Sequence, residues 1–160
     1  MEIKNTRSLT ELIFTKLKER YDQLSWSLYP PIQNLEALSP RVSNLNLSSF
    51  EITRKYSDGR LSAEIHFTLN LLFKDIDLAE FNIRDAAFSI SAFLHRNNFN
   101  HDQIGETEII SNEPDYLQPD IDGYLSWKIE FLIPFACGES VYEANGEAPD
   151  VEINSSINHD

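Results

Sequence analysis

The stretch LSAEIHFTLNLLF, residues 61–73, decides the fold of this chain of 160 residues, because apolar and polar residues alternate along it. The odd-numbered positions are all apolar, and the even-numbered positions are polar from Ser62 to Asn70. A period of two residues is typical of a β-strand that buries one face. At about 3.4 Å per residue the stretch would span roughly 44 Å, whereas most strands have about 5–6 residues. We therefore expect the strand to bend or to project beyond its own core.

The residues that precede this strand predict a β-hairpin. Residues 41–52 have an uneven strand pattern that indicates a β-bulge. The dipeptide Asp58-Gly59 then favours a tight turn, because glycine tolerates the positive φ that such turns need. The end of the hairpin nearest the turn is a candidate arm that reaches another subunit. Its charged and aromatic side chains are Arg54, Lys55, Tyr56, Asp58 and Arg60.

A first helix is expected near the start of the chain. Ser8 and Glu11 have the spacing of a capping box, in which each side chain binds a free backbone N–H of the other, so the helix should begin near Leu9. Apolar residues at three- and four-residue spacing give the helix one buried stripe. The stripe comprises Leu9, Leu12, Ile13, Leu17, Tyr21 and Leu24. The prolines that follow predict a loop over residues 31–40.

A second helix is expected directly after the long strand. Asp77 and Glu80 indicate its start, because acidic residues favour the first turn of a helix. Its predicted buried stripe comprises Phe81, Ile83, Ala86, Ala87, Ile90, Phe93 and Leu94.

Two further strands follow this helix. A weak pattern indicates a short strand at residues 107–110. Strict alternation at residues 124–135 predicts a long strand, with Trp127 on its apolar face and Pro134 at its end or at a sheet edge. Together the elements predict a mainly antiparallel sheet with a long β-hairpin, flanked by two α-helices.

The net charge of −13 comes entirely from the second part of the chain. Residues 1–96 carry 12 acidic and 12 basic residues, whereas residues 97–160 carry 14 acidic residues against Lys128 alone. Nucleic-acid phosphates and anionic lipids bind clustered Lys and Arg, so we expect neither specific DNA binding nor attachment to a membrane. No apolar run is long enough to span a bilayer, and the first residues do not form a signal-peptide core. We therefore expect a protein that is made in a reducing cytoplasm.

Two segments contain most of the acidic residues in this second part of the chain. Residues 111–123 combine acidic residues with prolines and a glycine, which predicts an exposed loop. Residues 139–160 carry six acidic residues and no Lys or Arg, so we expect a tail that is disordered or that is ordered only by a partner. The sequence therefore predicts one domain over residues 1–138 and an acidic tail over residues 139–160.

The sequence contains no local motif that is typical of an enzyme. It lacks the glycine-rich phosphate loops, the HExxH zinc motif and the GxSxG nucleophile elbow. Its single cysteine, Cys137, excludes an internal disulfide, and a pairing of this thiol with His66 as a base has no support in the spacing. We therefore expect no enzymatic activity and no cofactor.

Two groups of residues are candidate metal ligands. His95 with His101 and Asp102 could ligate a metal ion, and acid pairs such as Asp120 with Asp122 could bind calcium. Solvated side chains at a helix end and in an acidic loop are the simpler interpretation of both groups. We therefore expect no metal site.

The polar face of residues 61–73 suggests a contact surface. This face presents His66, Thr68 and Asn70, which are polar but carry little charge, followed by Leu72. A solvated sheet face usually carries more Lys and Glu. Two interpretations are open: a neighbouring subunit covers this face, or the face is simply exposed to solvent.

The order of the elements leads to a family resemblance. The stretch SDGRLSAEIHFTLNLLFKD, the helix NIRDAAFSISAFLHRN and the strand GYLSWKIEFLIPFACGES resemble the tail terminator and tail completion proteins of long-tailed bacteriophages and of related contractile particles. The likeness covers roughly residues 9–140 and depends on element order and hydrophobic pattern. The extension at residues 139–160 lies outside it, and the loop at residues 31–40 is not matched.

The resemblance implies an α+β domain, with a sheet flanked by helices, that assembles as a hexameric ring. The ring would lie at the head-proximal end of the tail tube, where it would stop tube polymerisation and present a joining surface to the head. The implied partners are copies of the chain itself, the tail tube protein and the head-tail connector protein, with the sheath protein as a further candidate. DNA would pass through the ring, and acidic residues facing the conduit would repel its phosphates. The implied location is the tail or neck of the virion, assembled in the host bacterial cytoplasm.

The ring contacts are expected at the hairpin tip and the acidic loop. The loop residues are Asp115, Asp120 and Asp122, and the basic residues of the tip would meet these acids in the next copy. A contact between two different surfaces is head-to-tail, which is the type that closes rings. Salt would weaken it, because the attraction is between charges.

A different class of function is the alternative. An acidic binding module could occupy a basic site on a host protein, for example as an inhibitor that mimics DNA. Such a module needs dense acids on a rigid face, whereas many acids here lie in the expected tail. Removal of residues 144–160 separates the two hypotheses, because it should abolish the activity of a module and leave particle assembly by a terminator.

Overall fold

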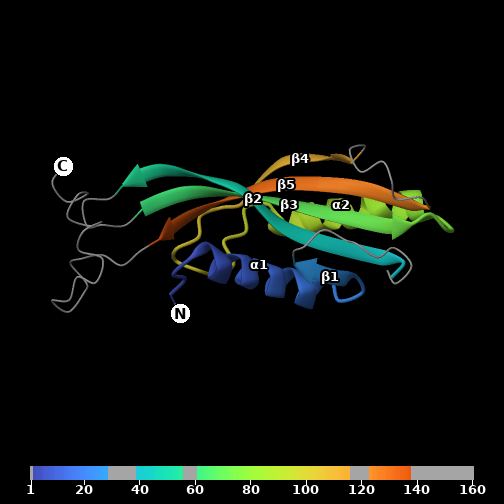
Figure 1. Cartoon of the computed structure of the whole chain (residues 1–160), viewed down its shortest axis with the longest axis horizontal. Helices are drawn as coiled ribbons and strands as arrows, with labels where there is room; N and C mark the ends of the chain where they lie inside the picture. The colour runs from blue at the N-terminus through green and yellow to red at the C-terminus, as the bar shows by residue number, and fades with distance from the viewer. Residues whose placement is uncertain (1, 29–38, 56–60, 116–122, 138–160) are drawn as a thin grey trace.

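The computed structural model describes residues 2–28, 39–55, 61–115 and 123–137. Figure 1 shows an elongated molecule in which a long sheet carries helices along its length. In chain order the described elements are α1 (Thr6–Arg20), β1 (Ser25–Leu28), β2 (Arg41–Lys55), β3 (Leu61–Lys74), α2 (Ala79–Leu94), β4 (Glu108–Pro114) and β5 (Tyr124–Cys137).

The five described strands form one mixed sheet in the order β1-β2-β3-β5-β4. β1 runs parallel to β2, and the other neighbouring pairs are antiparallel. β3 is the central strand, where Phe67 lies opposite Leu47 on β2 and Phe131 on β5. The fold is therefore α+β with a mainly antiparallel sheet, and the predicted fold class is confirmed.

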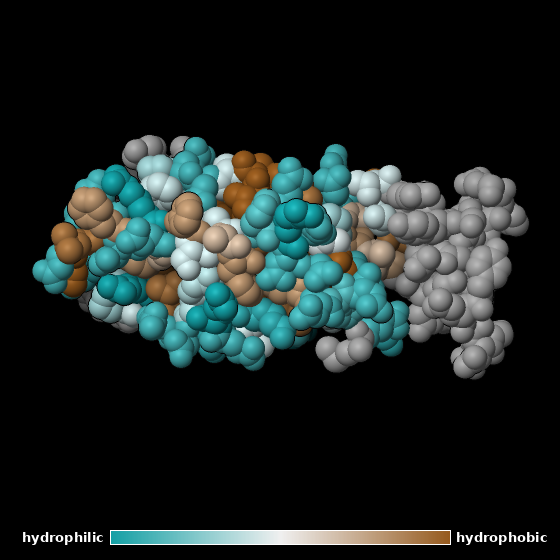
Figure 2. All heavy atoms as spheres, turned by 180° about the vertical axis from the view of Figure 1, so that it is seen from behind, coloured by the Kyte–Doolittle hydropathy of each residue, from teal (hydrophilic) through white to brown (hydrophobic). Residues whose placement is uncertain are grey.

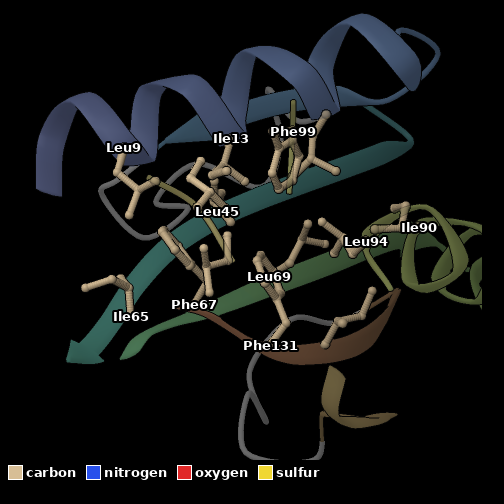
Figure 3. Close-up of a cluster of buried hydrophobic side chains, with 14 of the residues drawn as sticks. Leu9, Ile13, Leu45, Ile65, Phe67, Leu69, Ile90, Leu94, Phe99 and Phe131 are labelled. Atoms are coloured by element: carbon tan, nitrogen blue, oxygen red, sulfur yellow. The ribbon is translucent and has the colours of Figure 1, made fainter. Parts of the chain in front are cut away.

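The core lies between the helices and the face of the sheet that carries the odd-numbered residues of β3. Figure 3 shows side chains of α1, α2 and the strands meeting there, and the rings of Phe67 and Phe131 stack with their centroids 5.3 Å apart. A fully buried side chain of this kind contributes about 1.5–3 kcal/mol. The core residues labelled in that view are Leu9, Ile13, Leu45, Ile65, Phe67, Leu69, Ile90, Leu94, Phe99 and Phe131.

The first helix begins earlier than predicted. Its N-cap is Asn5, whose side-chain oxygen accepts a hydrogen bond of 2.8 Å from the backbone N–H of Ser8. Glu11 instead pairs with Arg7 one turn back, with 2.9 Å between Oε1 and Nε. The predicted capping box was wrong because Asn5 is an equally good cap three residues earlier, which places both box residues inside the helix. The predicted stripe is confirmed at its centre, where Leu9, Ile13 and Leu17 are buried.

The second helix starts close to the predicted acids, with Glu80 in its first turn and Asp77 before it. Leu78 occupies the N-cap position without a side-chain hydrogen bond, and Asp77 lies in the turn before it with φ +40°. Phe81 is exposed, not part of the core, which corrects the predicted stripe. The buried residues are Ala79, Ile83, Ala87, Ile90 and Leu94, and Phe81 lies only two positions before Ile83, so the two side chains point to different sides of the helix.

Two strands differ from the sequence prediction. β1 was not predicted, because four residues give no measurable period and the parallel pairing with β2 is not visible in the sequence. β4 continues to Pro114, so residues 111–114 belong to a strand and not to the predicted loop. The polar side chains of this strand concealed it, but its backbone pairs with β5 and places Glu113 opposite Lys128.

Pro134 lies inside β5 and neither ends the strand nor breaks its pairing with β3. Residue 134 is opposite Glu64, and its carbonyl accepts a hydrogen bond from Gly105 N–H on the other side of the strand, at 2.8 Å. The nitrogen of a strand residue points to the same side as its carbonyl. The missing N–H therefore faces residues 103–105, which form a short bridge with β5, and it costs no bond in the β3–β5 ladder.

The long hairpin is confirmed as a paired ladder. β2 pairs with β3 along its length, and register shifts between Leu47 and Ser49 and between Ile52 and Arg54 correspond to the predicted irregularity. The predicted turn at Asp58-Gly59, most of the predicted loop at residues 31–40, residues 116–122 and the predicted tail lie outside the described residues. The predicted division between a domain and a tail therefore stays a prediction.

Candidate functional site

Three strands extend past the helices at one end of the molecule. We call this end the arm, and it consists of residues 49–55 of β2, 61–65 of β3 and 133–137 of β5. Figure 1 shows it extending beyond the N-terminal end of α1, while α2 lies towards the opposite end. The sequence predicted a two-stranded hairpin here, and the structure adds β5 as a third strand because the β3–β5 ladder continues to Cys137.

The arm exposes two large apolar side chains. Phe50 and Ile52 are 55% and 49% exposed, and they lie opposite Ile65 and Ala63 on the face of the sheet that elsewhere packs on the helices. Their exposure follows from the length of the strands, since neither described helix reaches this end (Figure 1). On the same face Ile65, Ile133 and Phe135 are buried in one cluster with Ile3 and Ile104, so the uncovered part of the face is its β2 edge.

Only part of the predicted hairpin tip is described. The backbone of Arg54 lies opposite Ser62, and that of Lys55 lies opposite Leu61. Tyr56, Asp58 and Arg60 lie outside the described residues.

A second apolar surface lies at the opposite end of the molecule. Ile76, Leu78 and Phe81 are 51%, 70% and 61% exposed, and we call these three residues the turn patch. They belong to the turn from β3 into α2 and to the first turn of that helix. Figure 2 shows hydrophobic side chains gathered at this end of the space-filling view. Sequence reasoning missed the patch, because it assigned Phe81 to the core and treated the turn only as a helix start.

A small hollow adjoins the turn patch. Its volume is about 90 Å³, about three times the volume of a water molecule in the liquid. The guanidinium carbon of Arg41 lies 5.6 Å from the centroid of the Phe73 ring, which holds one wall in place. The hollow is lined by Pro40, Arg41, Phe73, Lys74, Ile76, Asp77, Ala79 and Asn82.

The predicted polar face is present on the side of the sheet away from the core. His66, Thr68 and Asn70 are all partly buried there, and a row across the sheet joins Ser27, Asn44, Asn70, Lys128 and Glu113. The Asn44 amide donates a hydrogen bond of 2.9 Å to the Ser27 hydroxyl. The side-chain oxygens of Asn70, Ser111 and Ser126 are buried and form no hydrogen bond within the described part of the chain.

Lys128 is the cation near the middle of this face. Its Nζ lies 3.1 Å from the Glu130 carboxylate and 3.7 Å from that of Glu113, and its side chain is 21% exposed. The hydrogen bond to Glu130 raises the pKa of Lys128, and the nearby carboxylates of Glu113 and Asp115 act in the same direction. The only Lys or Arg in the second part of the sequence is therefore held by acids of β4 and β5.

The predicted acidic loop is described only at its first part. Asp115 follows β4, and its backbone N–H donates to the carbonyl of Ser126, which lies opposite Leu72 near the end of β3. Asp115 is thus at the end of the sheet opposite the arm. Asp120 and Asp122 lie outside the described residues.

The candidate catalytic and metal-binding residues do not come together. His66 lies opposite Leu132 on β5, whereas Cys137 lies opposite Leu61 near the arm tip, so this thiol and imidazole lie in different rows of the sheet. His101 accepts a hydrogen bond from Gln103 N–H through Nδ1, at 3.2 Å. Among the described residues, no group of three or more His, Cys, Asp or Glu side chains is placed to hold a metal ion.

No protein-family model matches the sequence, and no curated protein matches it. Within the described segments, neither helix has both the length and the apolar character that a membrane crossing requires. The function must therefore be inferred from the surfaces of the fold, of which the arm and the turn patch are the most distinctive.

Proposed function

We propose that this chain is a structural subunit without enzymatic activity, which assembles with copies of itself into a ring. In this proposal the ring acts as a tail terminator of a long-tailed bacteriophage or a related contractile particle. It ends growth of the tail tube at the head-proximal end and forms the surface to which the head is joined. Its partners are the tail tube protein and the head-tail connector protein, with the sheath protein as a further candidate, and its place is the neck of the virion.

The observation that carries the proposal is the arm. The β2 edge of the arm, which lies beyond both described helices, leaves the apolar side chains of Phe50 and Ile52 half exposed (Figure 1). Full burial of a Phe or Ile side chain is worth about 1.5–3 kcal/mol, so covering half-exposed Phe50 and Ile52 would contribute roughly half of that each. Association of copies supplies the missing layer, whereas a monomer leaves the contribution unused.

The charge distribution is consistent with a ring through which DNA passes. The second part of the chain has 14 acidic residues against one basic residue, Lys128, which is engaged by Glu113 and Glu130. A surface with this balance repels phosphates, so DNA would slide past it without binding.

The first test is the effect of losing the gene in the particle that carries it. The proposal expects tail tubes of irregular, excessive length that do not join heads, because nothing ends their growth. Normal tails joined to heads would overturn it. The control is the same particle with the gene restored in trans, which should recover tails of uniform length.

The second test is self-association of the complete chain. Native mass spectrometry and light scattering at low salt should give a closed oligomer of one size, for which the family resemblance implies six copies. A chain that stays monomeric up to high concentration would count against a ring built by the chain alone.

A further inference from the structure

The two exposed apolar surfaces lie at opposite ends of the long axis and differ in shape. The arm carries Phe50 and Ile52 on a projecting ladder, and the opposite end carries the turn patch beside the hollow (Figures 1 and 2). One is a projection and the other is a recess. A contact between two arms would leave every hollow empty, whereas a contact between an arm and a hollow covers both surfaces of each copy.

We infer that the arm of one copy seats Ile52 and Phe50 on the hollow and turn patch of the next copy. The inference rests on the proposed function, because it names the contact that would build the ring. The hollow of about 90 Å³ is of the size that a branched aliphatic side chain fills, and its walls include Pro40, Phe73 and Ala79. Exposed Leu78 and Phe81 extend the apolar surface beyond the hollow and would receive the aromatic ring.

The charges near the two surfaces favour the same pairing. Arg54 and Lys55 follow Ile52 at the end of β2, whereas residues 75–80 include three acids and no base. Glu80 is held by Arg84 at 2.6 Å, which leaves Asp75 and Asp77 as the acids that face outward at the turn. The hollow itself is lined by Arg41 and Lys74 as well as by Asp77, so the excess of acid lies at the turn around it and the hollow is matched by apolar contact. Opposite charges at the rim orient the encounter of two copies.

A contact of this kind uses two different surfaces of each copy. It is therefore heterologous, and repetition of one heterologous contact produces a closed ring when the rotation between copies divides a full turn. Asp115 lies at the same end of the sheet as the turn patch. This acid, which was predicted to meet the hairpin tip of the next copy, is therefore beside the surface that would receive the arm.

The decisive experiment mixes two variants of the complete chain. Ile52→Asp destroys the apolar projection and keeps the hollow, whereas Ile76→Asp damages the hollow and keeps the projection. Both residues are about half exposed, so both variants are expected to fold, which circular dichroism and thermal unfolding check. The control is Phe88→Asp, which changes a side chain of α2 that is 77% exposed and does not line the hollow.

Each variant alone should require at least roughly 30-fold higher concentration to assemble, as expected when an interface anchor is removed. The 1:1 mixture should give a dimer and nothing larger, because only one intact projection and one intact hollow remain in it. The Phe88→Asp control should assemble like the natural chain. Rings from either variant alone would overturn the arm-and-hollow contact and leave the proposed ring standing. A mixture that stays monomeric would also overturn the contact.

A cross-linking measurement tests directly which residues of two copies come together. Ile52→Cys in one copy and Asn82→Cys in another, each combined with Cys137→Ser, should form a covalent dimer under mild oxidation when the two are mixed. Each cysteine variant alone should form much less dimer. Equal or greater yields from the separate variants would overturn the inference, and monomeric behaviour of the natural chain would overturn the proposed ring together with it.

Discussion

Leu61, the first residue of β3, lies directly opposite Cys137, the last residue of β5, and on its other side it lies opposite Lys55 at the end of β2. The arm is therefore three strands wide up to its last described residues. An isolated two-stranded hairpin is marginal in water, whereas three strands hold a fixed shape. Phe50 and Ile52 are thus carried on a rigid support, which lowers the entropy that is lost when a partner binds.

The capping of α1 gives a prediction that separates the structure from the sequence pattern. Asn5→Ala should lower the free energy of unfolding by about 1 kcal/mol, because the Ser8 N–H loses the side-chain acceptor that it has at 2.8 Å. Ser8→Ala should have an effect within about 0.5 kcal/mol, since Ser8 is inside the helix. Urea unfolding at matched protein concentration measures both, and a larger loss for Ser8→Ala would show that the helix starts at the capping box.

The aromatic pair at the centre of the sheet should be a major source of stability. Phe67→Ala removes a fully buried ring that stacks on Phe131, and we expect a loss of about 3–5 kcal/mol. Phe88→Ala serves as the matched control, because this ring is 77% exposed and its removal should change stability by less than about 0.5 kcal/mol. Similar losses from the two substitutions in chemical unfolding would contradict the described core.

Lys128 should make the stability of the folded chain depend on pH in the alkaline range. Its pKa is raised in the folded chain by the hydrogen bond to Glu130, so the ammonium binds its proton more tightly when the chain is folded. The stability that it contributes is therefore fully present below the unfolded pKa of about 10.4 and is lost as pH rises through the folded pKa. The stability difference between the natural chain and Lys128→Met should be constant at neutral pH and shrink above about pH 10. A difference that stays the same across that range would refute this role.

Salt should weaken assembly. The Debye length falls from about 10 Å at 0.1 M to about 3 Å at 1 M ionic strength, which screens the rim charges but not the apolar contact of Ile52 with the hollow. The midpoint concentration for assembly, measured by light scattering, should therefore rise with added NaCl without assembly being lost. Arg54→Gln should reduce this salt dependence, and an unchanged dependence would show that the rim charges are elsewhere.

The sequence was most informative where a pattern was long and strict. Alternation at residues 61–73 predicted β3 to within one residue, because a slip of one position would turn every core side chain of that strand to the wrong face. β1 was missed because its pairing with β2 is a tertiary contact that four residues cannot encode. Phe81 was misassigned because an apolar residue beside the correct helical stripe looks like part of it.

The candidate contact surfaces could be predicted only in part. The length of the alternating stretch at residues 61–73 is enough to indicate a projecting arm, and its even-numbered residues are enough to indicate the polar face. The hollow could not be predicted, since Pro40, Phe73 and Asn82 are brought together only by the turn from β3 into α2. The exposure of Ile76 and Leu78 likewise depends on where the helix starts.

The central claim is that copies of this chain associate through surfaces at their opposite ends. The most direct test is native mass spectrometry of the complete, unmodified chain at low ionic strength over a range of concentrations. The account predicts one closed oligomer in equilibrium with monomer, with six copies as the number that the family resemblance implies. A monomer at every concentration, or an oligomeric series without a preferred size, would contradict it.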